Sequence, residues 1–182
     1  MDEIKKEKED GLDWEYLAEG LKEKEALKGE YYTPHAGLFG QMFSVFAKSV
    51  IDVVGKEKGE AIIMRAVEVF GEERGRRIAE KVRALDKPLS FKNFMAYTDL
   101  DSSMILEYAP KIEDGDLHLE INRCDFEQGA SEWGLREYFK YYCMYVDVAI
   151  LKGYNPELNL EIPKKLSDGD DICFFKYNIK GK

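Results

Sequence analysis

The sequence predicts an α+β fold in which N-terminal helices are followed by a mainly antiparallel sheet with one inserted helix. In the first half, apolar residues recur every three or four positions, which is typical of amphipathic helices. After Pro88 the period changes to two, which is typical of half-buried strands. An apolar stretch at residues 135–152 returns to the helical spacing and predicts the inserted helix. Helices and strands segregated along the chain in this way indicate the α+β class.

The chain has 182 residues, which is enough for one domain with a sizeable core. We expect a flexible acidic arm at residues 1–11 and a single α+β domain at residues 12–182. Within this domain, the helical half is expected at 13–85 and the sheet half at 91–177.

The first predicted helix is short. Asp13 is a suitable N-cap, and Tyr31-Tyr32-Thr33-Pro34 ends the element. Its apolar positions are Trp14, Leu17, Leu21 and Leu27.

Two longer helices are expected to follow it. Ala36–Val54 carries large apolar residues at helical spacing, and Lys56–Leu85 continues the pattern. Gly71 and Gly75 lie inside the second of these helices and indicate a kink or a close crossing with another helix.

The sheet half is predicted to contain five strands in a meander, with helices packed on one side, and a helix at Leu135–Lys152 that Gly153 ends. The strands are expected at Phe91–Thr98, Ser103–Tyr108, Asp116–Cys124, Leu158–Ile162 and Asp171–Tyr177. In the third strand, strict alternation predicts that Cys124 shares a face with His118, opposite to Leu119 and Ile121.

Composition excludes several classes of function. A net charge of −9 without a basic stripe is unsuited to nucleic acid or to an anionic membrane surface. The N-terminus has no apolar segment typical of a secretory signal. An odd number of cysteines then favours a reducing cytoplasm with free thiols. We expect a small-molecule substrate as the partner, and a homo-oligomer is compatible with the sequence.

Asp147 is the sharpest candidate for chemistry. It is the only charged residue in the stretch 141–151, and the i,i+4 spacing places it on one helix face with Cys143. If that face is buried, the carboxylate must be paired, protonated or open to a pocket. A carboxylate beside a thiol on an apolar helix suits general acid–base work, whereas the structural alternative is a capping or paired carboxylate.

The other candidates lie at strand ends and turns. As a nucleophile, Cys124 would need a base, and His118 lies about 20 Å away along the strand, which argues against a Cys–His dyad. Arg123 could hold a substrate carboxylate in a bidentate contact. Asp170 suits a turn that orients backbone N–H groups, and Cys173 suits packing.

Neighbouring elements usually pack together, so we expect Cys124, Cys143, Asp147 and Cys173 to face one cavity, with His118 near its rim. The same groups could hold Zn²⁺. However, no two cysteines lie within four residues of each other, unlike the close pairs of structural zinc sites. A Gly-rich phosphate loop, His-Glu-x-x-His and Gly-x-Ser-x-Gly are also absent from the sequence, so no metal or other cofactor is expected.

Three segments have a characteristic order and spacing: Arg123-Cys124, then Tyr142-Cys143-x-x-x-Asp147, then Gly169-Asp170-x-x-Cys173-x-Phe175. Upstream, Phe70–Glu80 contains a Gly, an Arg-Gly pair and a following Ala. Over roughly residues 36–178, this set resembles the L-2-amino-thiazoline-4-carboxylic acid hydrolase family. One departure is Asp125, where the family generally has Pro after the first cysteine.

The resemblance implies a hydrolase that opens a cyclic, amidine-like thiazoline carboxylate to N-carbamoyl-cysteine. Asp147 would activate water or accept a proton, and Cys143 or Cys124 would attack or orient. Substrate would be bound by Arg123, His118, Asp170 and Cys173. The alternative is a non-catalytic small-molecule sensor, because Gly-Asp-x-x-Cys-x-Phe also resembles sensor domains of the vinyl-reductase type.

Overall fold

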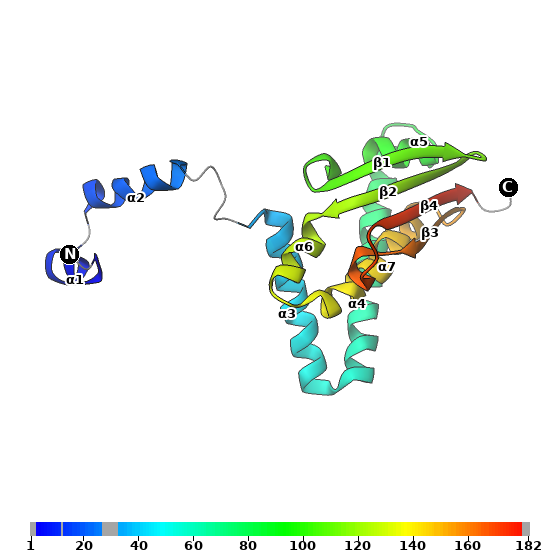
Figure 1. Ribbon diagram of the computed structural model, residues 1–182. Helices are drawn as coiled ribbons and strands as arrows, with labels where there is room; N and C mark the ends of the chain where they lie inside the picture. The colour runs from blue at the N-terminus through cyan, green and yellow to red at the C-terminus, as the bar shows by residue number, and fades with distance from the viewer. Residues whose placement is uncertain (1–2, 12, 27–32, 180–182) are drawn as a thin grey trace. The chain divides into compact units, whose positions relative to one another are not determined.

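The computed structural model describes residues 3–11, 13–26 and 33–179, and the chain divides into two units, Met1–Thr33 and Pro34–Lys182 (Figure 1). The boundary predicted from the sequence lies after residue 11. The first unit contains α1 (Glu3–Asp10) and α2 (Trp14–Ala26). Leu27 and the Tyr31-Tyr32 part of the predicted helix end lie outside the described residues.

The second unit combines helices with a four-stranded antiparallel sheet in the order β1-β2-β4-β3, which confirms the α+β prediction. β4 pairs between β2 and β3, so the predicted simple meander is wrong. The strands are β1 (Leu106–Glu113), β2 (Asp116–Cys124), β3 (Leu158–Lys164) and β4 (Cys173–Ile179). The helices are α3 (His35–Val54), α4 (Lys56–Arg83), α5 (Phe91–Tyr97), α6 (Asp125–Glu132) and α7 (Arg136–Tyr154), with 3₁₀ turns η1 (Ser102–Met104) and η2 (Leu166–Asp168).

The crossing of α4 and α7 builds the centre of the core. A side chain at Gly75 would collide with the backbone carbonyl of Ile150 and would lie 2.6 Å from the backbone nitrogen of Tyr154. At Gly71, a Cβ atom would lie 2.6 Å from that of Ala149. The two glycines therefore mark a close helix crossing, which was one of the two predicted options, and α4 runs without interruption. Gly153 lies inside α7, not at its end, because Asn155 caps the helix.

The segment Phe91–Thr98 was predicted as a strand, and this is wrong, because Phe91–Tyr97 forms α5. Its N-cap Ser90 accepts a hydrogen bond from the backbone N–H of Asn93, which favours a first helical turn. At i,i+3 spacing, Phe91 and Phe94 both face the core: Phe91 packs on Tyr177, and Phe94 packs on Tyr154. A short aromatic run does not distinguish strand from helix by itself.

A β-bulge changes which face of β2 carries its cysteine. Glu107 of β1 pairs with Arg123, but the next residue, Tyr108, pairs with Ile121, so Asn122 is an extra residue in the strand. The extra residue reverses the alternation beyond it. Cys124 therefore lies on the face of Ile121, and the predicted face shared with His118 is wrong.

Helix α6, which the sequence analysis did not predict, follows directly after Cys124. Its first residue is Asp125, whose backbone N–H donates to the carbonyl of Ile105 at 3.0 Å. A proline at this position could not donate that bond. An acidic residue suits the first turn because the N-terminal end of a helix carries partial positive charge.

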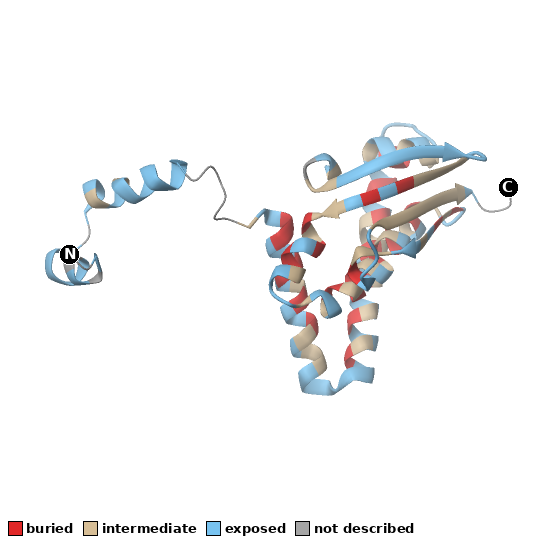
Figure 2. Cartoon of the chain, viewed as in Figure 1, coloured by how far each residue is buried: buried red, intermediate tan, exposed pale blue. Residues whose placement is uncertain are grey.

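Helix α3 has the length and apolarity of a membrane span, by composition alone, and 28% of the apolar stretch is buried. Core helices of other proteins pass the same test. Figure 2 shows how buried and exposed residues alternate along the helices of this unit.

Candidate functional site

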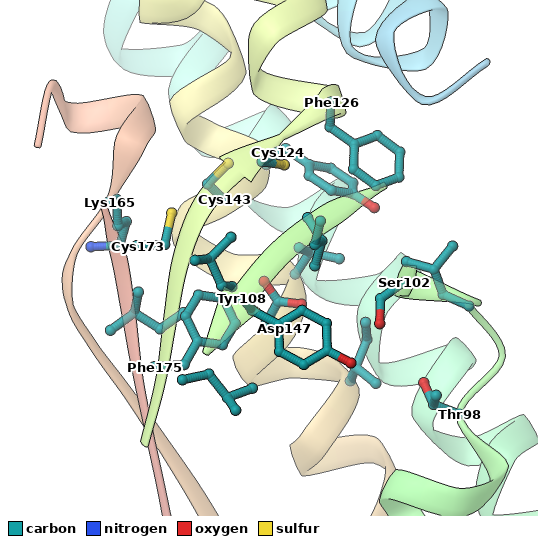
Figure 3. A pocket seen from close by; sticks show the side chains of 18 of the residues that line it. Thr98, Ser102, Tyr108, Cys124, Phe126, Cys143, Asp147, Lys165, Cys173 and Phe175 are labelled. Atoms are coloured by element: carbon teal, nitrogen blue, oxygen red, sulfur yellow. The ribbon is translucent and has the colours of Figure 1, made fainter. Parts of the chain in front are cut away.

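A cavity of about 190 Å³ lies between the sheet and α7 and is lined mostly by apolar side chains. β1, β2 and β4 supply one wall, and α7 supplies the other. α5, Thr98 after it and Ser102 at the start of η1 lie at one end (Figure 3). Cys124, Cys143, Asp147 and Cys173 all line this cavity, as the packing argument predicted.

Asp147 reaches the cavity from the buried side of α7, one turn after Cys143 (Figure 3). Protein surrounds the carboxylate, yet the residue keeps intermediate accessibility, which fits a group that faces a cavity. Burial raises the pKa of Asp147 to about 6, and Arg74 acts in the opposite direction. Asp147 makes no hydrogen bond or ion pair with any residue that the structure describes. The carboxylate is therefore available to a ligand.

The three thiols gather toward one end of the cavity (Figure 3). Burial raises the pKa of Cys124 to about 12, although the N–H groups of Phe126 and Glu127 act in the opposite direction. Burial also raises the pKa values of Cys143 and Cys173. All three residues are therefore thiols, not thiolates, at neutral pH.

Arg74 brings a positive charge to the cavity wall from α4. Its Nε and Nη2 atoms donate to the carboxylate of Asp99 at 2.9 and 2.7 Å, and the pair is largely shielded from solvent. The hydrogen bond with Asp99 offsets the effect of burial, so the pKa of Arg74 is raised. The Nη1 group makes no hydrogen bond with the described residues and can still bind an anion.

Arg123, the predicted carboxylate-binding residue, does not line the cavity. Its Nε donates to Glu107 at 2.8 Å, and Nη1 pairs with Asp125. Asp125 does not line the cavity either, so the departure from the family's proline adds no carboxylate to the pocket.

His118 and Asp170 also lie outside the cavity. His118 is on the outer face of β2, where its Nδ1 lies 3.1 Å from Glu113 and its ring packs edge-on against Phe174. Asp170 accepts a hydrogen bond from the backbone N–H of Lys165 at 2.8 Å, which is the turn role that its position indicated.

Sequence reasoning missed Arg74 as a cavity residue, although a signal was present. Val67, Gly71, Arg74 and Ile78 follow the i,i+4,i+7,i+11 spacing of one helix face, and the other three are buried. An arginine on such a face needs a buried partner or a pocket. Tyr108 and Lys165 are further lining residues that no local pattern singled out.

No group of three or more His, Cys, Asp or Glu side chains is arranged to hold a metal ion within residues 3–11, 13–26 and 33–179. To an organic ligand, the cavity offers the carboxylate of Asp147, the guanidinium of Arg74 and the thiols of Cys124, Cys143 and Cys173.

The family model for L-2-amino-thiazoline-4-carboxylic acid hydrolase matches residues 35–177. No curated protein matches the chain. Among solved structures, the chain is similar to a trafficking protein particle complex subunit 3 from Naegleria fowleri covalently bound to palmitic acid. The identity is 13% and the TM-score 0.47, with 80% of this chain and 95% of that chain covered. It is also similar to the phenol-responsive sensory domain of the transcription activator PoxR with phenol. Here the identity is 14% and the TM-score 0.49, with 81% of this chain and 76% of that chain covered.

Proposed function

Because the chain belongs to the L-2-amino-thiazoline-4-carboxylic acid hydrolase family, we propose that it hydrolyses a small cyclic amidine that carries a carboxylate. A thiazoline carboxylate is the first candidate substrate. The observation that carries this proposal is the carboxylate of Asp147, which has no hydrogen-bond or ion-pair partner among the described residues and lies in a ring-sized apolar cavity.

The size of the cavity supports a single ring. An engineered cavity of about 150 Å³ in another protein holds benzene, so about 190 Å³ suits a five-membered ring with small substituents. Apolar walls would favour the ring itself, and a few polar groups would orient it.

The charges in the cavity support a ligand with one positive and one negative end. Asp147 can pair with an amidinium, and the free Nη1 group of Arg74 can bind a carboxylate. The two residues interact electrostatically with each other and come from neighbouring helices, α4 and α7, that border one cavity. In this proposal Arg74 takes the role that the sequence analysis gave to Arg123.

In the proposed reaction, water attacks the ring carbon between nitrogen and sulfur. The ring enters as an amidinium, protonated on its ring nitrogen. Asp147 accepts one proton from the water, and the electron pair of the C=N bond moves to that nitrogen, which becomes a neutral N–H group. The neutral adduct then collapses as its C–S bond breaks and a C=O bond forms. The sulfur leaves with the hydroxyl proton as a thiol, and Asp147 returns its proton to solvent.

The raised thiol pKa values favour attack by water over attack by a cysteine. A cysteine nucleophile must be a thiolate, and burial disfavours the thiolate of both Cys124 and Cys143. Asp147, with a pKa of about 6, is instead mostly ionised at neutral pH and can act as a base. The cysteines then shape and line the pocket.

The test is to incubate the purified chain with 2-amino-thiazoline-4-carboxylate and to follow the new free thiol by a colorimetric reagent. We expect thiol release by the wild type and its loss, by roughly 100-fold or more, in Asp147→Asn. By calorimetry, this variant should still bind the substrate, more weakly than the wild type because the pair with the amidinium is lost. Cys124→Ser and Cys143→Ser should each keep turnover within roughly tenfold, because neither is the nucleophile.

Glu120→Gln is the matched control, because it removes an exposed carboxylate from the outer face of β2. Arg74→Lys should raise KM more than it lowers kcat, since it weakens substrate binding. Binding without thiol release from any cyclic amidine carboxylate would contradict the hydrolase proposal and leave the sensor alternative. Loss of turnover in Cys143→Ser would contradict direct attack by water.

A further inference from the structure

Helix α3 buries mainly small residues and leaves several large apolar residues exposed, although Phe43, Val50 and Ile51 pack against the core. The buried residues of α3 are small or polar: Ala36, Gly37, Gly40, Gln41, Ser44 and Ala47. At Gly40, a side chain would collide with the backbone carbonyl of Phe126, so this side of α3 packs closely on α6. An ordinary surface helix has the opposite arrangement of side chains, with large apolar residues buried and charged residues exposed.

The outward side carries an apolar stripe, interrupted by Ser49, which we define as Leu38, Met42, Val45, Phe46 and Val53. Met42 is 62% exposed, Phe46 64% and Val53 83%. The exposed fractions of the stripe residues correspond to roughly 550 Å² of accessible residue surface, within the range of the largest apolar patch on a typical monomer. It is also about two-thirds of the ~800 Å² that each partner contributes to a standard interface.

We propose that this stripe is the contact surface between two copies of the chain. A two-fold interface uses the same patch on both partners, so one self-complementary stripe is sufficient. In an antiparallel pair of α3 helices centred on Val45 and Phe46, Leu38 of one copy lies beside Val53 of the other. Residues 36–47 carry no charged side chain, so this contact buries no unpaired charge there.

The charges beside the stripe favour contact with a second copy of the chain over contact with an anionic membrane. Lys48 and Asp52 are exposed and pair with each other within one helix, so they can stay at the rim of the interface. The chain as a whole carries a net charge of −9 and is repelled by anionic lipid.

Sedimentation velocity on the full chain at micromolar concentrations tests the proposal. The wild type should sediment as a dimer, with twice the chain mass of 21.0 kDa. Phe46→Glu should raise the dimer dissociation constant by roughly 100-fold, because it places a charge at the centre of the contact. Circular dichroism should show unchanged helicity, since Phe46 is mostly exposed within one copy.

Two further variants make the result decisive. Met42→Lys should also weaken the dimer, which guards against a folding defect specific to Phe46→Glu. Ile112→Glu is the matched control, because Ile112 is 69% exposed on β1, outside the stripe, and this variant should remain dimeric. A monomeric wild type, or a Phe46→Glu protein that remains dimeric, would overturn the proposal. Co-sedimentation of a monomeric wild type with phosphatidylcholine vesicles would identify a membrane as the occupant instead.

Discussion

Asp147 links the stability of the fold to pH. Its pKa is about 6 in the folded chain, above the ordinary value of 3.8, because burial disfavours the charged form. The folded state therefore holds the proton over a pH range in which the unfolded state has released it. From this group, the free energy of unfolding falls as pH rises from about 4 to about 6, by about 3 kcal/mol, and then stays level.

We expect Asp147→Asn to remove this loss, because asparagine has no charge to bury. In urea denaturation, we compare the free energy of unfolding of the variant with that of the wild type. The difference, variant minus wild type, should be about 3 kcal/mol larger at pH 8 than at pH 4. Glu120→Gln, which changes an exposed carboxylate, should show no such pH-dependent difference. If the free energies of unfolding of Asp147→Asn and the wild type differ by the same amount at both pH values, the carboxylate is not buried.

Individual site residues were predictable where a single helix placed them. Asp147 and Cys143 could be assigned to one cavity because i,i+4 spacing fixes their relative position and an isolated charge on an apolar helix needs a pocket. The orientation of Cys124 depends on the bulge at Asn122, which local alternation does not reveal. The bulge brings Cys124 to the cavity, while His118, on the other face, stays outside it.

At the scale of elements, the α4–α7 crossing depends on a glycine. Gly75→Ala would place a methyl group against the backbone of Ile150, so the two helices must separate. We expect a loss of about 3 kcal/mol in the free energy of unfolding, measured by urea denaturation followed by near-ultraviolet circular dichroism. Gly20→Ala in α2 is the control, because a methyl group there meets no atom within 4 Å. A Gly75→Ala protein as stable as the wild type would show that the crossing is looser than described.

Long elements were predicted well and short ones poorly, for a physical reason. α3, α4 and α7 each present a periodic apolar pattern over several turns, so a few atypical residues do not obscure it. α5 and α6 have only seven and eight residues. In α5, the cap at Ser90 and the contact of Phe94 with Tyr154 decide the structure, against the strand preference of its aromatic residues.

At the scale of the whole molecule, the cavity exists because elements distant in sequence meet around it. α4 supplies Arg74, α7 supplies Asp147, and β1 supplies Tyr108. The sequence predicted that a pocket should form next to Asp147, but it could not show which cation would face the carboxylate. That choice depends on the helix crossing, which places Arg74 at the cavity wall, and on the β1–β2 register, which places Arg123 beside Glu107.

The central claim is that ionised Asp147 is the base for hydrolysis in this cavity, and a pH–rate profile tests it most directly. For thiol release from 2-amino-thiazoline-4-carboxylate, kcat/KM of the wild type should rise with pH through an apparent pKa of about 6 and then level off. Asp147→Asn should lose this limb together with most of the activity, whereas Cys143→Ser should keep it. A wild-type profile that is flat between pH 5 and pH 7 or so, or a limb that survives in Asp147→Asn, would contradict the account.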